Sequence, residues 1–237
     1  LRNESAKIGK TTLQDLLAED LTTLFFSLLK LGLGQRDAQV WSQLSAEIQL
    51  LRNVNLDDEK ALRIIEGRLS DFISKLKKLL RQPFTSENSE LVFLRVIDFI
   101  NLNDLRKTYA RYSTGDLLEI NLVALKEFFT KCVRTQDTWR EFLDEFEGVN
   151  HIPLMTIHKS KGLEFDTTIF MGIDDQAWWS YRPDDPEGLS TFFVALSRAK
   201  QRIIFSYCEE RGQRNKIEYF YRLLYSAGLQ EYMIPSD

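Results

Sequence analysis

The periodicity of the apolar residues changes near residue 148, and this change limits the folds open to the chain. Before it, apolar residues recur at the spacing of amphipathic helices, in stripes within residues 13–29, 40–51, 62–80, 91–112, 117–133 and 139–146. After it, β-branched and aromatic runs predict strands at 152–157, 167–173 and 202–207, with helices at 187–200 and 215–227. We therefore expect a mostly α-helical domain, residues 1–148, followed by a partial α/β domain, residues 149–237.

Composition is consistent with such a protein. The 237 residues are 43% hydrophobic, enough to fill one large or two modest cores. The cysteines, Cys132 and Cys208, lie far apart, so we predict two buried thiols and neither a disulfide framework nor a metal site. The sequence has no apolar run of bilayer length and no basic-then-apolar leader. A soluble, cytoplasmic protein without a membrane partner is expected.

A polar turn between the first two predicted strands is the first candidate site. It offers the hydroxyl of Thr156, the ring of His158, neighbouring lysines and the open backbone of Gly162. Groups of these kinds suit phosphate oxygens, so an anion is the expected ligand. Arg198 lies within the predicted helix 187–200, and its planar fork can meet a terminal phosphate through two hydrogen bonds.

Two stretches resemble motifs of a known family. Residues 154–166 read LMTIHKSKGLEFD and residues 194–200 read VALSRAK, which resemble motifs V and VI of the UvrD/Rep family of superfamily 1 DNA helicases. The resemblance implies an α/β RecA-like domain of the P-loop NTPase type, without the P-loop itself. It places Thr156 and His158 on the DNA backbone, Gly162 and Glu164 at the nucleotide cleft, and Arg198 as an arginine finger. Glu187 matches the acidic residue that opens the motif VI helix.

Each of these residues also has a plainer interpretation. Thr156 would merely end a strand, His158 would cap a turn, and Glu164 would be a solvated surface carboxylate. For one residue alone the plainer interpretation is favoured. A block of this length in register favours the motif, because a long match escapes the false positives of short patterns.

Two further stretches imitate nucleotide motifs. Gly9-Lys10-Thr11 copies the end of a phosphate loop, but that motif needs a glycine where this chain has Glu4, so we expect Thr12 and Asp15 to form a helix N-cap instead. Asp174-Asp175, after an apolar strand, imitates a magnesium site without its phosphate loop. The aromatic residues that follow, Trp178, Trp179 and Tyr181, would either stack bases or pack over the sheet edge, and we favour packing.

The resemblance also sets the expected activity. It implies the C-terminal part of an ATP-dependent DNA helicase, with residues 1–148 as a helical, 2B-like insertion and residues 149–237 as part of the second, 2A-like RecA domain. ATP and Mg²⁺ would act in a longer parent, whose missing N-terminal domain completes the ATP site. The isolated chain is expected to bind neither tightly and to hydrolyse no ATP. Lys161 before Gly162 and the helical insertion favour 3′ to 5′ movement.

The expected partners are single-stranded and duplex DNA, the missing N-terminal domain, and a repair or nuclease protein. The net charge of −4 predicts weak DNA binding by this chain alone, since basic residues supply most nonspecific affinity. An alternative is a catalytically silent helicase-like module that binds a DNA-repair or nuclease partner. A recombination-type, nuclease-linked subunit would need a nuclease domain after motif VI. A cytoplasmic, bacterial setting is expected.

Overall fold

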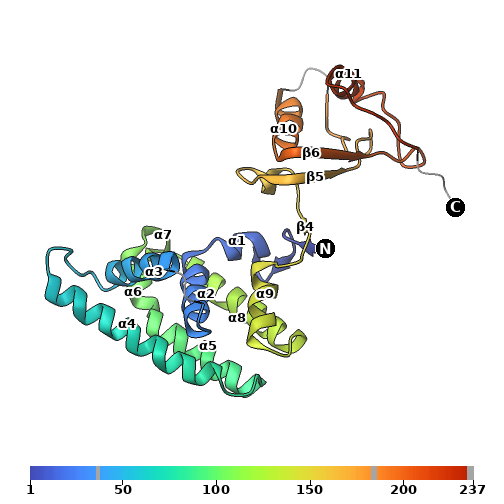
Figure 1. Ribbon diagram of the computed structural model, residues 1–237. Helices are drawn as coiled ribbons and strands as arrows, with labels where there is room; N and C mark the ends of the chain where they lie inside the picture. The colour runs from blue at the N-terminus through green and yellow to red at the C-terminus, as the bar shows by residue number, and fades with distance from the viewer. Residues whose placement is uncertain (36–37, 183–185, 234–237) are drawn as a thin grey trace. The chain divides into compact units, whose positions relative to one another are not determined.

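The computed structural model describes residues 1–35, 38–182 and 186–233, and its chain divides into two compact units. Unit 1 comprises Leu1–Leu154 and unit 2 comprises Met155–Asp237. The sequence pattern placed the change after Gly148. Unit 1 is mostly helical, and unit 2 is α/β with a small parallel sheet, as Figure 1 shows. The assignment of these units to helicase subdomains stays a prediction.

Amphipathic helices build unit 1. They are α1 (Leu13–Leu17), α2 (Asp20–Gly32), α3 (Ala38–Leu51), α4 (Glu59–Leu80), α5 (Ser86–Ile100), α6 (Leu102–Thr108), α7 (Ala110–Ser113), α8 (Leu117–Thr135) and α9 (Trp139–Glu147). The helical pattern predicted at 91–112 is confirmed, and the structure divides it among α5, α6 and α7. Asn101 interrupts it with φ of 67°, and its side chain caps α6 by accepting from the Asn103 N–H.

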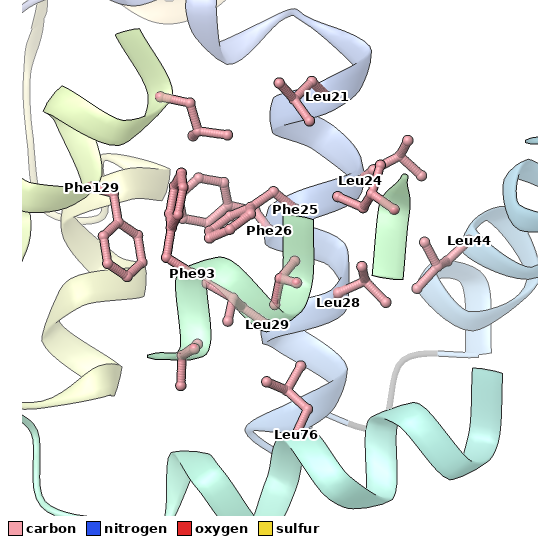
Figure 2. Packing of buried hydrophobic residues seen from close by; sticks show 14 of the residues in the cluster. Leu21, Leu24, Phe25, Phe26, Leu28, Leu29, Leu44, Leu76, Phe93 and Phe129 are labelled. Carbon is pink, nitrogen blue, oxygen red and sulfur yellow. The ribbon is translucent and has the colours of Figure 1, made fainter. Parts of the chain in front are cut away.

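Helix α2 lies at the centre of the unit 1 core. Its buried residues include Leu24, Phe25 and Leu28, which Figure 2 shows among side chains from neighbouring helices. The Phe25 ring packs against Phe93 of α5 at 5.2 Å between centroids and edge-on against Phe129 of α8 at 5.7 Å. Tilted and edge-on pairs of this kind add to the gain from burial. The apolar stripe of α2 therefore packs against several neighbouring helices at once.

Side-chain caps fix where the helices begin. The Thr12 hydroxyl accepts from the Asp15 N–H at 3.3 Å at the start of α1, so the predicted N-cap is confirmed. Lys7–Ile8 (β2) and Thr11–Thr12 (β3) pair antiparallel, which makes Gly9 and Lys10 the turn of a hairpin. Gly9 has the positive φ, 57°, that such a turn requires. The phosphate-loop imitation is thus a hairpin turn.

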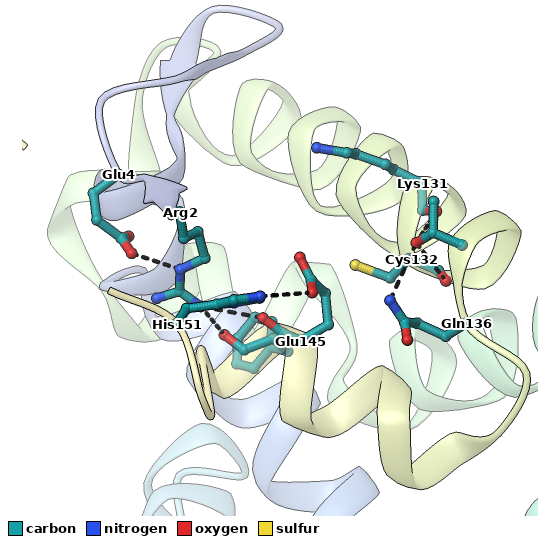
Figure 3. Close-up of polar contacts among 9 residues, drawn as sticks. Arg2, Glu4, Lys131, Cys132, Gln136, Glu145 and His151 are labelled. Atoms are coloured by element: carbon teal, nitrogen blue, oxygen red, sulfur yellow. Dashed lines mark hydrogen bonds and ion pairs between the residues drawn. The ribbon is translucent and has the colours of Figure 1, made fainter. Parts of the chain in front are cut away.

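The two ends of unit 1 are paired with each other. Arg2–Asn3 (β1) runs parallel to Pro153–Leu154 (β4), so the predicted strand 152–157 is wrong in length and pairs with the beginning of the chain. Arg2 Nη1 donates to the carbonyls of Glu145 and Phe146 at 3.1 and 3.0 Å, and its Nε pairs with Glu4, as Figure 3 shows. A cation at the last carbonyls of α9 is the favourable match for a helix C-terminus.

Unit 2 is built on two parallel strands. Phe165–Met171 (β5) pairs with Ala199–Ser206 (β6), and Pro186–Leu196 (α10) precedes β6. Glu218–Ser226 (α11) completes the unit. Phe170, Trp178 and Phe192 form its core with Phe220, whose ring stacks on Phe192 at 4.2 Å. No helix in the described part of the chain is both long and apolar enough to cross a membrane.

Candidate functional site

The segment after Thr156 forms a tight 3₁₀ turn, His158–Ser160. The Lys159 N–H donates to the Thr156 hydroxyl at 3.4 Å, and the Ser160 N–H donates to the Thr156 carbonyl at 3.1 Å. Ser160 is buried, and its own hydroxyl donates to the Ile157 carbonyl at 2.7 Å. Thr156 therefore shapes the turn from both its side chain and its backbone, while the side chains of Thr156 and His158 lie exposed.

Gly162 follows the turn in a left-handed conformation. Its φ is +86°, which side chains with a Cβ rarely adopt, and a Cβ placed there would meet no atom within 4 Å. Glycine is thus required by the backbone and not by a close neighbour. The open space beside it leaves the peptide accessible to a ligand.

Arg198 does not lie on a helix, contrary to the sequence expectation. Helix α10 ends at Leu196 and β6 begins at Ala199, so Ser197 and Arg198 form the turn between them. The Arg198 carbonyl accepts from the Phe165 N–H at 2.8 Å, and Arg198 Nε donates to the Val194 carbonyl at 2.9 Å. The helix ends before Arg198 for two reasons. The Arg198 backbone pairs with β5, and the Arg198 side chain caps the last turn of α10.

The Arg198 guanidinium is held by the turn segment. Nη1 donates to the carbonyls of Ser160 at 3.2 Å and Leu163 at 2.7 Å, and Nη2 donates to the Ser197 hydroxyl at 2.8 Å. With the bond from Nε, these contacts use every guanidinium N–H except one on Nη2. Arg198 thus connects the two motif-like stretches, residues 154–166 and 194–200.

Glu164 lies next to this network and pairs with Lys200. The carboxylate and the Lys200 Nζ are 3.6 Å apart, with side chains 62% and 54% exposed. A pair so open to solvent contributes little to stability, so both groups are available to a ligand. Gly162, Glu164 and Arg198 are brought together, and Thr156 and His158 lie on the adjoining turn. Their roles as nucleotide and DNA contacts stay predictions.

Sequence reasoning missed several participants. The carbonyls of Ser160, Leu163 and Val194 hold Arg198, and backbone acceptors leave no trace in residue types. Lys200 is another, and its signal was available, because a lysine at the end of one motif stands opposite a glutamate in the other.

The carboxylates of Asp174 and Asp175 fasten loops of unit 2. Asp174 is fully buried, with Oδ1 accepting from the N–H groups of Gln176 and Ala177 and Oδ2 forming an ion pair of 3.1 Å with Arg211 Nε. Asp175 accepts from the N–H groups of Asn215 and Lys216 at 3.1 and 3.0 Å, just before α11. Both carboxylates are therefore engaged. Among the described residues, no group of three or more His, Cys, Asp or Glu could hold a metal ion.

The aromatic residues of the same loop divide into two kinds. Trp178 and Tyr181 are buried, and Tyr181 packs on Phe220 at 4.5 Å. Trp179 is 76% exposed. The favoured interpretation, packing in the fold, is confirmed for Trp178 and Tyr181, whereas Trp179 presents its ring to solvent.

Comparison with known proteins agrees with the motif resemblance. The chain is 26% identical over 149 residues to the ATP-dependent DNA helicase Rep of Buchnera aphidicola subsp. Acyrthosiphon pisum, covering 60% of this chain and 21% of that protein. It is 21% identical over 203 residues to DNA helicase II of Haemophilus influenzae, covering 76% of this chain and 28% of that protein. The chain therefore spans a fifth to somewhat over a quarter of the length of these relatives. The family described as the UvrD-like helicase C-terminal domain matches residues 34–210, more than half of the chain. The chain belongs to the UvrD-like helicase C-terminal domain family.

Proposed function

We propose that this chain forms the C-terminal part of an ATP-dependent DNA helicase or translocase, with Arg198 as the arginine finger. The observation that carries the proposal is the grouping of Gly162, Glu164 and Arg198 beside the turn that bears Thr156 and His158. The match of residues 34–210 to the helicase C-terminal family supports it. In this proposal the arginine acts on the γ-phosphate and the turn acts on DNA.

The nucleotide side of the site is formed by three residues. The open space at Gly162 allows a nucleotide to approach the backbone, and the exposed carboxylate of Glu164 is suited to accept hydrogen bonds from ribose hydroxyls. Arg198 keeps one N–H for an anionic oxygen. ATP binding would require the phosphate loop and magnesium ligands of an N-terminal domain, because Asp174 and Asp175 are already engaged.

The DNA side consists of the exposed side chains of Thr156 and His158. A hydroxyl and a ring N–H are suited to phosphate oxygens of a single strand and carry no base preference. In the family's terms, residues 1–148 act as the 2B-like insertion and residues 149–237 as the 2A-like, RecA-like part. The helical insertion favours movement from 3′ to 5′.

DNA-stimulated ATP hydrolysis by the full-length gene product tests this proposal. Because arginine fingers contribute about 10³ to 10⁵ in rate, Arg198→Ala is expected to reduce turnover by at least about 10³-fold. Arg202→Ala is the matched control, since Arg202 lies exposed on β6 close by. Near-normal turnover of Arg198→Ala contradicts the finger assignment. A full-length product without any DNA-stimulated hydrolysis supports the silent module that binds a repair or nuclease partner.

A further inference from the structure

The bonds of Arg198 tie the proposed nucleotide contact to the proposed DNA contact. Nη1 holds the carbonyls of Ser160 and Leu163, which bound the segment that contains Gly162. The N–H of Ser160 donates in turn to the carbonyl of Thr156. Ser160 therefore links the guanidinium to the turn with His158, through its carbonyl on one side and its N–H on the other.

A phosphate competes for the same donors. A two-bond contact between a guanidinium and a phosphate needs two N–H groups that point the same way, and the bonds to described residues leave just one N–H, on Nη2, uncommitted. At least one existing bond must therefore break when Arg198 meets a phosphate in this way. If the bonds that break are those to the Ser160 and Leu163 carbonyls, the segment between these residues is released.

We propose, resting on the proposed function, that Arg198 is a latch: its guanidinium holds the Ser160–Leu163 segment in the nucleotide-free state and releases it on meeting a phosphate. We further propose that Ser197 is the residue that positions this guanidinium. The Ser197 hydroxyl donates to the Val194 carbonyl at 3.0 Å and accepts from Arg198 Nη2 at 2.8 Å. The hydroxyl thereby fixes the plane of the Arg198 guanidinium. Threonine also has a hydroxyl and can do the same, whereas alanine cannot.

Amide hydrogen exchange on the nucleotide-free 237-residue chain tests the holding half of the latch. Hydrogen bonds to charged groups contribute enough that their loss corresponds to about tenfold or more in a local opening equilibrium. Arg198→Ala is therefore expected to accelerate exchange of the Ser160 and Leu163 amides about tenfold, and Arg198→Lys to restore little, because a single ammonium cannot replace the fork. Arg202→Ala is expected to leave these amides unchanged.

The amides of β5 control for general unfolding. They should exchange at the wild-type rate in every variant, and circular dichroism should show an unchanged fold. If Arg198→Ala unfolds unit 2 as a whole, Ser197→Ala replaces it, with faster exchange confined to the segment and rescue by Ser197→Thr. Unchanged exchange in a folded Arg198→Ala chain overturns the latch, as does equal acceleration of β5 and the segment in Ser197→Ala.

The releasing half of the latch is measured in the full-length gene product, as the coupling between nucleotide binding and single-strand DNA binding. The ratio of single-strand affinities with and without a nonhydrolysable ATP analogue reports this coupling. It is expected to fall towards one in Ser197→Ala, to recover in Ser197→Thr, and to stay at the wild-type value in Arg202→Ala. A wild-type ratio in Ser197→Ala contradicts the positioning role.

The two proposals fail in different ways. Loss of ATP hydrolysis in Arg198→Ala without any change in segment exchange keeps the finger and removes the latch. Faster segment exchange with normal hydrolysis keeps the holding contact and removes the finger.

Discussion

At the scale of single residues, Thr156 has a structural role besides its proposed contact with DNA. Its hydroxyl accepts from the Lys159 N–H and shapes the turn, so Thr156→Ala alters the turn as well as the surface. Thr156→Ser keeps the acceptor and is the matched control. His158 lies exposed on the same turn, which makes its substitution the cleaner probe.

We predict that His158→Ala in the full-length gene product weakens single-strand binding equally for oligonucleotides of any sequence, because backbone contacts carry no base preference. Basal ATP hydrolysis should stay unchanged. Thr156→Ser should bind as the wild type does, and Thr156→Ala more weakly. Fluorescence anisotropy with labelled oligonucleotides measures these affinities. A loss confined to one sequence would show that His158 contacts bases.

Glu164 provides a second prediction at this scale. If its carboxylate contacts the ribose, Glu164→Ala raises KM for ATP with little change in kcat or DNA affinity, since the ribose does not react. Lys200→Ala separates this role from the ion pair, because it leaves the carboxylate in place. ATP titrations of both variants are the measurement. Equal rises in KM would assign the effect to the pair and not to Glu164 alone.

At the scale of helices, two glycines predict opposite effects of one substitution. A Cβ at Gly32 in α2 would lie 2.7 Å from Leu80 and 2.9 Å from Leu76 of α4, whereas a Cβ at Gly67 in α4 meets nothing within 4 Å. We expect Gly32→Ala to lower the free energy of unfolding by about 1–3 kcal/mol through overpacking. Gly67→Ala should raise it by about 0.5–1 kcal/mol, because alanine favours the helix.

Urea denaturation of both variants gives the comparison on one chain. A stabilised Gly32→Ala variant would mean that the Leu76 and Leu80 side chains move aside without loss of packing energy.

The helices also show what a sequence reveals. The stripes around Phe25 and Leu69 predicted helices because burial on one face imposes the helical period. The break at Asn101 was missed because it depends on a side chain that competes for backbone N–H groups within an apolar pattern that continues across it. The same limit holds at the site. Motif residues such as Gly162 were found from the sequence, but the carbonyls that hold Arg198 became visible only in three dimensions.

At the scale of the whole molecule, the two thiols distinguish the two units. Cys132 in unit 1 is buried, and burial raises its pKa to about 12, whereas Cys208 in unit 2 is exposed, so the expectation of two buried thiols was wrong for Cys208. Cys208 lies two residues beyond the end of β6, next to the exposed residues Glu209 and Glu210.

We therefore predict that a thiol reagent modifies Cys208 of the native chain at once and Cys132 only as unit 1 unfolds. Because folding raises the Cys132 pKa, its contribution to stability is complete below the ordinary value of 9.0 and is lost as the pH rises from there towards about 12. Reagent kinetics with Cys208→Ser, compared with Cys132→Ser, separate the two rates. Rapid modification in Cys208→Ser would show that unit 1 opens readily.

A last prediction concerns the activity of these 237 residues by themselves. They should hydrolyse no ATP, because Gly9 and Lys10 form a hairpin turn and the Asp174 and Asp175 carboxylates are engaged in the fold. A phosphate-release assay of the purified chain, with Lys10→Ala beside it, is the measurement. Turnover that Lys10→Ala abolishes would reinstate the phosphate loop.

The contact between Arg2 and the last carbonyls of α9 has a consequence for how the sequences of homologues vary. Gly148, with φ of +71°, ends α9, and a Cβ there would collide with the Arg2 guanidinium. A side chain at position 148 would require the Arg2 side chain to move, so we expect positions 2 and 148 to covary although they lie far apart in sequence. Homologues that replace the glycine at position 148 are expected to carry a short side chain at position 2. A different donor is then expected to bond the carbonyls at the end of α9.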